Sequence, residues 1–177
     1  MKLLYPILLL WLFNISIASA GQLQTVDYVD PNLYVGRWYQ ISHNQMPFEP
    51  QNCMCAQQTL ALQTDGTLSV YNSCNDGSLT GPIREIHGVA SNNDPLTNAQ
   101  FTVDFGLPQK GQYWIIGLAA DYHWAVVSDP SGRSLYILSK TPTLSAEDYQ
   151  IAVNKAEEQV STQKLKSTIQ VGCAYPL

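Results

Sequence analysis

Residues 56–73 read AQQTLALQTDGTLSVYNS, and this stretch contains the pattern that recurs along most of the chain. Two short strand-like runs, 56–63 and 67–73, flank the segment Thr64-Asp65-Gly66. An Asp-Gly pair tolerates the positive φ angles of a tight hairpin turn. The stretch therefore predicts two antiparallel strands joined directly to each other.

Six further runs of the same kind occur before and after this hairpin. In one of them, Phe101, Val103 and Phe105 alternate with polar residues, as expected for a strand with one buried face. Asp129-Pro130-Ser131-Gly132 separates two others, with proline and glycine suited to a tight turn. The eight predicted strands are 38–44, 56–63, 67–73, 83–91, 99–105, 112–119, 123–128 and 133–140. Short strands at about ten-residue spacing predict an antiparallel sandwich or barrel.

One segment near the C-terminus departs from this pattern. Ser145 stands three residues before Asp148, an arrangement typical of a helix N-terminus. Apolar residues then recur at roughly helical spacing, so we expect a helix over 146–161 that packs its apolar stripe on the outside of the sheet. A short ninth strand over 168–171 is expected to bring Cys173 back to the sheet.

The N-terminus has the composition of an export signal. Lys2 precedes an apolar run over 3–13, and Ala18 and Ala20 form the small-residue pattern of a cleavage site. The run is shorter than the ~20 residues that a membrane-spanning helix needs. We expect removal of a signal peptide over 1–20 and a single domain over 21–177. Because no cysteine precedes Cys53, we expect a soluble protein without a thiol-linked lipid anchor, either secreted or periplasmic.

The charge and the motifs exclude several functional classes. The 177 residues include 14 acidic and 9 basic side chains, a net charge of −5, whereas nucleic-acid binding needs a basic face. We therefore expect no nucleic-acid partner. His-Glu-x-x-His, Gly-x-Ser-x-Gly and Gly-rich phosphate-binding motifs are absent from the sequence. The three histidines (His43, His87 and His123) stand at unrelated spacings, so no catalytic residue, metal ligand or cofactor is expected.

The four cysteines indicate two disulfide bonds. All of them lie in the part that we expect to be exported, and an even number in an oxidising compartment is typical of disulfides. Four cysteines allow three pairings. Counting from the Asp65-Gly66 turn places Cys74 beside Gln57, so a small bulge would bring Cys53 or Cys55 within bridging distance of Cys74.

Three local patterns together resemble the lipocalin family. They are Gly36-Arg37-Trp38 at the first strand, Asp121-Tyr122 before a hydrophobic strand, and the basic residue Lys140 at the end of the eighth strand. Their order and the trailing helix are similar to the branch of bacterial outer-membrane lipocalins and apolipoprotein D. The resemblance covers essentially the whole chain after residue 20. It implies an all-β fold, an eight-stranded up-and-down antiparallel β-barrel with one C-terminal α-helix packed on the outside.

The resemblance also implies structural roles for three residues. Gly36 permits the turn into the first strand, and Trp38 plugs the closed end of the barrel. Lys140 stands where most of this branch has arginine, so we expect a cation–π contact with Trp38 that lacks the planar stacking of a guanidinium.

The same branch implies a specific cysteine pairing. A cysteine that opens the second strand bonds one near the C-terminus, which corresponds to Cys55–Cys173 and leaves Cys53–Cys74. The alternative pairing is Cys53–Cys173 with Cys55–Cys74.

Members of this branch are carriers, so the resemblance implies a ligand inside the barrel. The branch has aromatic pocket residues at the positions of Trp114 and Tyr136, and strand alternation back from Lys140 places Tyr136 on the inner face. A loop over 43–52 would fold over the barrel mouth and contribute apolar contacts. The expected ligand-binding residues are Trp114, Tyr136, Ile116, Leu138, Phe101, Val103, Phe48 and Met46.

These expectations define a function and its alternatives. We expect a carrier for a small hydrophobic ligand, with a fatty acid or lysophospholipid favoured, and no enzymatic activity. The alternatives are an isomerase-like lipocalin enzyme that acts on a lipophilic substrate, and a carotenoid or bilin binder. We expect a monomer or a homodimer, and contact with a membrane surface is left open.

Overall fold

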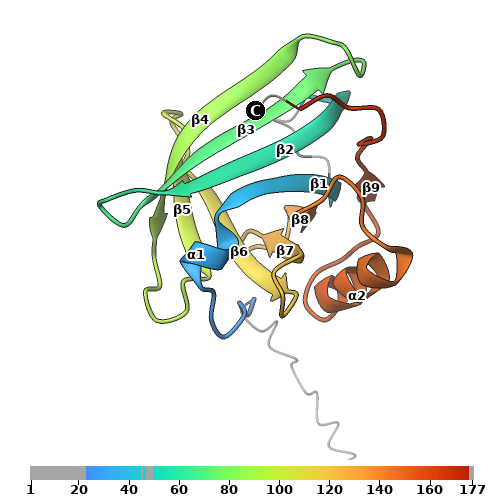
Figure 1. Ribbon diagram of the computed structural model, residues 1–177. Coiled ribbons are helices and arrows are strands. Elements are labelled where there is room, and N and C mark those ends of the chain that lie inside the picture. Colours follow the sequence, from blue (N-terminus) through green and yellow to red (C-terminus); the bar gives the residue numbers. More distant parts are fainter. Residues whose placement is uncertain (1–22, 45, 47–49, 176–177) are drawn as a thin grey trace, which may run out of the picture.

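Eight strands run up and down in chain order in the computed structural model, which describes residues 23–44, 46 and 50–175 (Figure 1). They are β1 (Gly36–Asn44), β2 (Cys53–Leu62), β3 (Leu68–Asp76), β4 (Ile83–Asn92), β5 (Gln100–Asp104), β6 (Gly111–Leu118), β7 (Trp124–Ser128) and β8 (Leu135–Ser139). Each strand pairs antiparallel with the next, and β8 pairs with β1. The predicted eight-stranded antiparallel barrel is therefore confirmed. The expected signal peptide, 1–20, lies outside the described residues.

The N-terminal segment covers one end of the barrel, which we call the floor; the opposite end is the mouth. The backbone N–H of Val26 donates to the carbonyl oxygen of Ile115 over 2.9 Å, and Val29 is buried below the strands. A short helix, α1 (Pro31–Tyr34), then leads into β1. The sequence prediction missed α1, although Asp30 caps it and Pro31 occupies its first turn, two signals typical of a helix start.

The C-terminal segment 165–173, which we call the C-terminal strap, completes the wall near the mouth. β1 pairs with β2 only over Gly36–Tyr39, and β9 (Leu165–Ser167) pairs with the mouth half of β1. The strand expected at 168–171 is therefore displaced to 165–167. Thr168 still donates its N–H to the carbonyl oxygen of Ile41 over 2.9 Å, and Cys55 donates its N–H to Ile169 over 2.8 Å.

Helix α2 (Ala146–Glu157) lies on the outside of the barrel, against β6, β7 and β8 (Figure 1). The hydroxyl of Ser145 accepts the N–H of Asp148 over 3.0 Å, which is the cap expected from the sequence. Ala152 and Ala156 are fully buried against the sheet. The helix ends at Glu157, four residues before the predicted end at 161.

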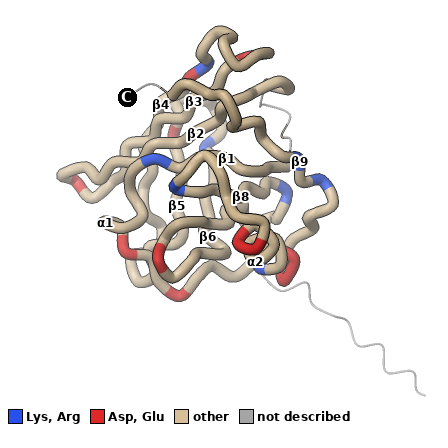
Figure 2. The backbone as a smooth tube through the Cα atoms, turned by 45° about the vertical axis from the view of Figure 1, so that its right-hand side comes forward, with Lys and Arg blue, Asp and Glu red and all other residues tan. Residues whose placement is uncertain are grey.

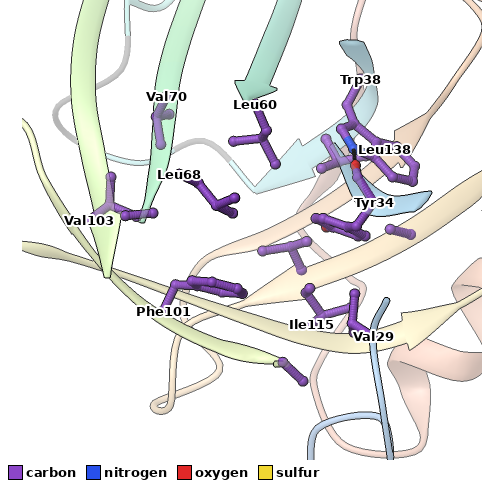
Figure 3. Packing of buried hydrophobic residues seen from close by; sticks show 14 residues of the cluster. Val29, Tyr34, Trp38, Leu60, Leu68, Val70, Phe101, Val103, Ile115 and Leu138 are labelled. Carbon is purple, nitrogen blue, oxygen red and sulfur yellow. Dashed lines mark hydrogen bonds between the residues drawn. The ribbon is translucent and has the colours of Figure 1, made fainter. Parts of the chain in front are cut away.

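The strands bury apolar side chains on two sides, in an inner and an outer cluster. The inner cluster fills the barrel and includes Trp38, Phe101 and Leu138 (Figure 3). The outer cluster lies between the sheet and α2 and includes Trp114 and Ala152. Charged residues are sparse and spread over several elements (Figure 2). Within the described residues, no helix is long and apolar enough to cross a membrane.

Candidate functional site

Three residues form the floor of the barrel interior. Trp38 is completely buried, and its indole Nε1–H donates to the carbonyl oxygen of Tyr34 over 2.8 Å. The Lys140 ammonium lies 4.1 Å from the centre of the Trp38 ring and donates to the carbonyl oxygens of Tyr34 and Val35 over 3.0 and 2.7 Å. Burial lowers the pKa of Lys140 to about 8, which leaves it protonated at neutral pH. The lysine thus ties the floor helix to the end of β8.

A small pocket lies above this floor, inside the barrel. It encloses about 10 Å³, room for about one water molecule. Apolar side chains from four neighbouring strands converge on it, and Figure 3 shows several of them facing Tyr34 and Trp38. The lining residues are Tyr34, Gln58, Leu60, Leu68, Val70, Ala90, Phe101, Val103 and Tyr113.

Two tyrosines and a glutamine form a hydrogen-bonded chain at the side of this pocket. The hydroxyl oxygens of Tyr34 and Tyr113 lie 2.7 Å apart, and the Tyr113 hydroxyl donates to Oε1 of Gln58 over 3.0 Å. Burial raises the pKa of both tyrosines well above the usual value, so both hydroxyls stay protonated. The pocket therefore combines apolar walls with neutral polar groups.

A fourth polar side chain lies next to this chain on β3. Asn72 is the register partner of Gln58, and it alternates in phase with the pocket residues Leu68 and Val70. Its side chain therefore points to the inside of the barrel. The Oδ1 atom of Asn72 is buried and lacks a hydrogen-bond partner among the described residues. Such an unpaired acceptor costs about 1–3 kcal/mol.

The structure places the residues expected to bind ligand in three different environments. Phe101 and Val103 line the pocket. Leu138 and Tyr136 belong to, or pack against, the inner cluster but lie outside the pocket lining. Met46 is a half-buried residue of the loop after β1. Phe48 lies outside the described residues.

The inward orientation predicted for Trp114 and Ile116 is wrong. Both side chains belong to the outer cluster under α2, whereas Tyr113 packs against the inner cluster and Ile115 belongs to it. Simple alternation would place Leu118 on the same face as Trp114, but Leu118 packs against the inner cluster because the register of β6 shifts between Ile115 and Gly117.

The prediction also missed most of the pocket residues. Leu60, Leu68 and Val70 alternate across the hairpin of residues 56–73, and this pattern could have identified them. Tyr34 is brought in by α1, which was not predicted. Gln58 and Asn72 are polar residues on strands, and such residues are assigned to the solvent side by default.

The cysteines form two disulfide bonds, Cys53–Cys74 and Cys55–Cys173. This is the pairing that the family resemblance implied. Cys55 adopts a positive φ of 57° at a register shift of β2, between Met54 and Gln57, and this shift directs it toward the strap. Within the described part of the chain, no group of three or more His, Cys, Asp or Glu side chains is arranged to hold a metal ion.

Comparison with known proteins identifies the family. Residues 29–170 match the family described as "Lipocalin-like domain", which covers most of the chain. This chain is a lipocalin. The match includes every barrel strand, the floor residues and helix α2.

Several lipocalins of known name are similar in sequence. "Temperature-induced lipocalin-1" of Arabidopsis thaliana is 32% identical over 158 residues, which cover 84% of this chain and 83% of the relative. "Outer membrane lipoprotein Blc" of Escherichia coli (strain K12) is 34% identical over 122 residues, which cover 69% of this chain and 68% of the relative. "Apolipoprotein D" of Oryctolagus cuniculus is 28% identical, and the matched residues cover 81% of this chain and 78% of the relative. The predicted branch is thereby confirmed, and this relationship supports a binder of small hydrophobic ligands.

Solved structures show the same fold at low sequence identity. Insecticyanin from the tobacco hornworm Manduca sexta superimposes with a TM-score of 0.67 at 17% identity and covers 84% of both chains. Lobster apocrustacyanin A1 superimposes with a TM-score of 0.64 at 15% identity, and the match covers 80% of this chain and 79% of that protein. At these identities the likeness concerns the barrel alone.

Proposed function

We propose that this lipocalin carries a fatty acid or lysophospholipid inside its barrel. The observation that supports the proposal is the pocket wall, in which apolar residues from β2, β3, β4 and β5 converge and no lining residue is charged. Each buried CH₂ group of an acyl chain contributes about 0.8 kcal/mol, so a long chain reaches micromolar affinity. The head group would remain near the mouth, close to Tyr136.

The size of the pocket requires the interior to adapt to such a ligand. A cavity of about 10 Å³ is much smaller than an acyl chain, so a bound chain must displace inner side chains such as Phe101 and Leu68. These side chains are apolar and can change rotamer without breaking a hydrogen bond. The ligand would then stabilise an expanded form of the interior that is sparsely populated without it.

The cysteine pairing favours a carrier over a thiol-dependent enzyme. A thiol enzyme of this fold would need a free cysteine in the barrel. All four cysteines of the sequence are paired in the two disulfides. The nucleophile that such chemistry requires is therefore absent.

We also propose that the protein is exported, to the periplasm or to the cell exterior, after removal of residues 1–20. Two disulfides support an oxidising compartment. The intact mass of protein recovered from that compartment measures the cleavage site directly.

Native mass spectrometry of the folded protein, followed by titration of the delipidated protein with a fatty acid, tests the carrier function. We expect a co-purified lipid that is released on unfolding, and micromolar binding of the added fatty acid. Val103→Thr, which adds a hydroxyl to the pocket wall without changing its volume, is expected to weaken binding about tenfold. The matched control is Val89→Thr on the neighbouring strand β4, where the side chain is 46% exposed.

Two outcomes would contradict the proposal. Delipidated protein that binds neither a fatty acid nor a lysophospholipid would exclude this ligand class. A coloured, absorbing ligand in the purified protein would instead favour the pigment-binding alternative.

A further inference from the structure

The C-terminal strap places one cationic side chain on the inner side of the barrel wall, at the mouth. β9 lies beside the mouth end of β1 (Figure 1), where His43 is the register partner of Lys166 on β9 and of Tyr136 on β8. Register partners on antiparallel strands have their side chains on the same face. Tyr136 packs against the inner cluster, so His43 and Lys166 also lie on the inner face.

The contacts of the neighbouring strap residues agree with this orientation. Thr168 alternates in phase with Lys166, and its Oγ1 lies 3.3 Å from Nδ1 of His43. Leu165, one residue before Lys166, packs instead against the outer cluster. Tyr136, His43 and Lys166 therefore form a row across three adjacent strands, on the inner face at the mouth.

The charge of Lys166 is not balanced by a carboxylate of the described residues. The strands around it, β8, β1, β9 and β2, contain no aspartate or glutamate. The acids that precede the strap in sequence have other partners, because Glu157 accepts the hydroxyl of Thr162 and Glu158 pairs with Lys155. Lys166 is exposed and takes part in no ion pair among the described residues. Its ammonium therefore remains available to a ligand at the mouth.

The row lies at a height above the floor that suits the head group of a single-chain lipid. The stretch of β1 from Trp38 to His43 is about 16 Å long in extended form. The apolar pocket lies between these two levels. A lipid whose head group stays at the row can therefore extend its chain into the pocket.

We propose that the Lys166 ammonium binds the anionic head group of the carried lipid, a carboxylate or a phosphate. The hydrocarbon chain runs from the row toward the apolar pocket wall that includes Leu60 and Phe101. At the mouth an anion keeps part of its hydration and meets an opposite charge, whereas the pocket lining offers no charged residue. This inference rests on the proposed carrier function and adds the charge of the head group and the residue that recognises it.

Lipids that share one chain but differ in head-group charge test the inference. Delipidated protein is titrated calorimetrically at neutral pH with dodecanoic acid, dodecyl phosphate and the uncharged dodecanol. We expect Lys166→Met to weaken the binding of at least one anion about threefold to fivefold, as for an exposed ion pair, and to leave dodecanol binding unchanged. The anion that loses more affinity identifies the head group, carboxylate or phosphate, that the lysine contacts.

A double variant that moves the lysine by one position provides the matched control. Lys166→Ser with Ser167→Lys keeps the composition and the net charge but turns the ammonium to the outer face, because successive strand residues point to opposite sides. Ser167 is exposed and pairs with Ser42, which also pairs with Ile137 of the outer cluster. We expect this variant to lose anion affinity as Lys166→Met does. Urea denaturation checks that both variants fold like the wild type.

The outcomes separate the two proposals. If the double variant binds both anions as tightly as the wild type, a charge on the inner face is not needed; the inference is then wrong and the carrier function stands. Equal weakening of the anions and of dodecanol by Lys166→Met would also overturn the inference, because the loss would not depend on head-group charge. If the wild type binds neither the anions nor dodecanol, the carrier function itself fails.

Discussion

Lys140 combines two stabilising interactions in one side chain. Its ammonium contacts the face of Trp38 and also donates hydrogen bonds to two carbonyl oxygens, those of Tyr34 and Val35. Gly36 leads the chain from α1 into β1 beside this lysine with a φ of 100°, a left-handed backbone conformation that side chains with a Cβ rarely adopt. The floor therefore holds together without the arginine that most of this branch has.

We predict that Lys140→Met lowers the free energy of unfolding by about 1–3 kcal/mol, because two carbonyl oxygens lose their donor and Trp38 loses its cation. Lys140→Arg is expected to retain most of the stability. Urea denaturation measures both. Lys166→Met, at an exposed position on β9, is the control and should change stability by no more than about 0.5 kcal/mol. A Lys140→Met protein as stable as the wild type would show that the lysine contributes nothing to the floor.

The pocket shows how far prediction from sequence reaches at the level of single residues. Phe101 and Val103 were predicted, because their strand has one apolar and one polar face and alternation fixes its orientation. Gln58 and Asn72 could not be predicted, because a polar strand residue is expected to face solvent unless other strands are known to supply hydrogen-bond partners, and Asn72 faces inward although its Oδ1 has no partner among the described residues. Those partners come from distant segments, as the Tyr113–Gln58 hydrogen bond shows.

At the level of elements, strand positions were easier to predict than strand orientations. All eight barrel strands occur within a few residues of their predicted bounds, because turn residues mark their ends. The orientation of β6 was predicted incorrectly, because α2 covers the outer face and makes both faces apolar. β7 shows the same effect, with all five of its residues buried. When both faces of a strand are apolar, the alternation of residue types does not indicate which face points into the barrel.

One histidine links helix α2 to the barrel through a charge that depends on pH. His123 contacts Asp121 through Nδ1, and its Nε2 lies 3.3 Å from Oδ1 of Asp148, in the first turn of α2. The hydrogen bond with Asp121 is the main cause of a raised His123 pKa, and Asp148 adds to it. The protonated imidazole thus connects the β6–β7 loop to the helix.

We predict a small pH-dependent contribution of this contact to stability. Because the pKa of His123 is raised in the folded protein, the contribution is fully present below the unfolded-state value of about 6.5, and it disappears as the pH rises through the raised folded value. Its size should stay under about 1 kcal/mol, since the side chain is 39% exposed. Unfolding curves of wild type and His123→Gln should therefore differ more at pH 5 than at pH 9.

The matched control for this prediction is His87→Gln. His87 is an exposed histidine on β4. A pH dependence shared equally by both variants would contradict the role of His123.

At the scale of the whole molecule, the two disulfides constrain the chain to different extents. Cys53–Cys74 joins residues 21 apart, within one hairpin. Cys55–Cys173 joins residues 118 apart and fixes the C-terminal strap to β2. The entropy that a cross-link removes from the unfolded chain grows with the length of the loop that it closes.

We predict that removing Cys55–Cys173 destabilises the protein more than removing Cys53–Cys74. Loop entropy gives about 5 kcal/mol for the long loop and about 3 kcal/mol for the short one. The two double alanine variants are compared by urea denaturation. Hydrogen exchange at the backbone amides of residue 55 and Thr168, which bond the strap to the barrel, should accelerate only in the variant that lacks Cys55–Cys173. Equal destabilisation by both variants would mean that the strap stays in place without its bond.

The strap also sets the order in which the molecule can be completed during synthesis. Gln170 donates hydrogen bonds from Nε2 to the carbonyl oxygens of Gln40, on β1, and Ala56, on β2, over 2.7 and 2.8 Å, and so spans the seam between these strands. A ribosome makes β1 and β2 early and residue 170 more than a hundred residues later. Until then, the mouth halves of both strands remain unpaired edges of the nascent chain. The wall of this barrel can therefore close only after nearly all of its strands have been translated.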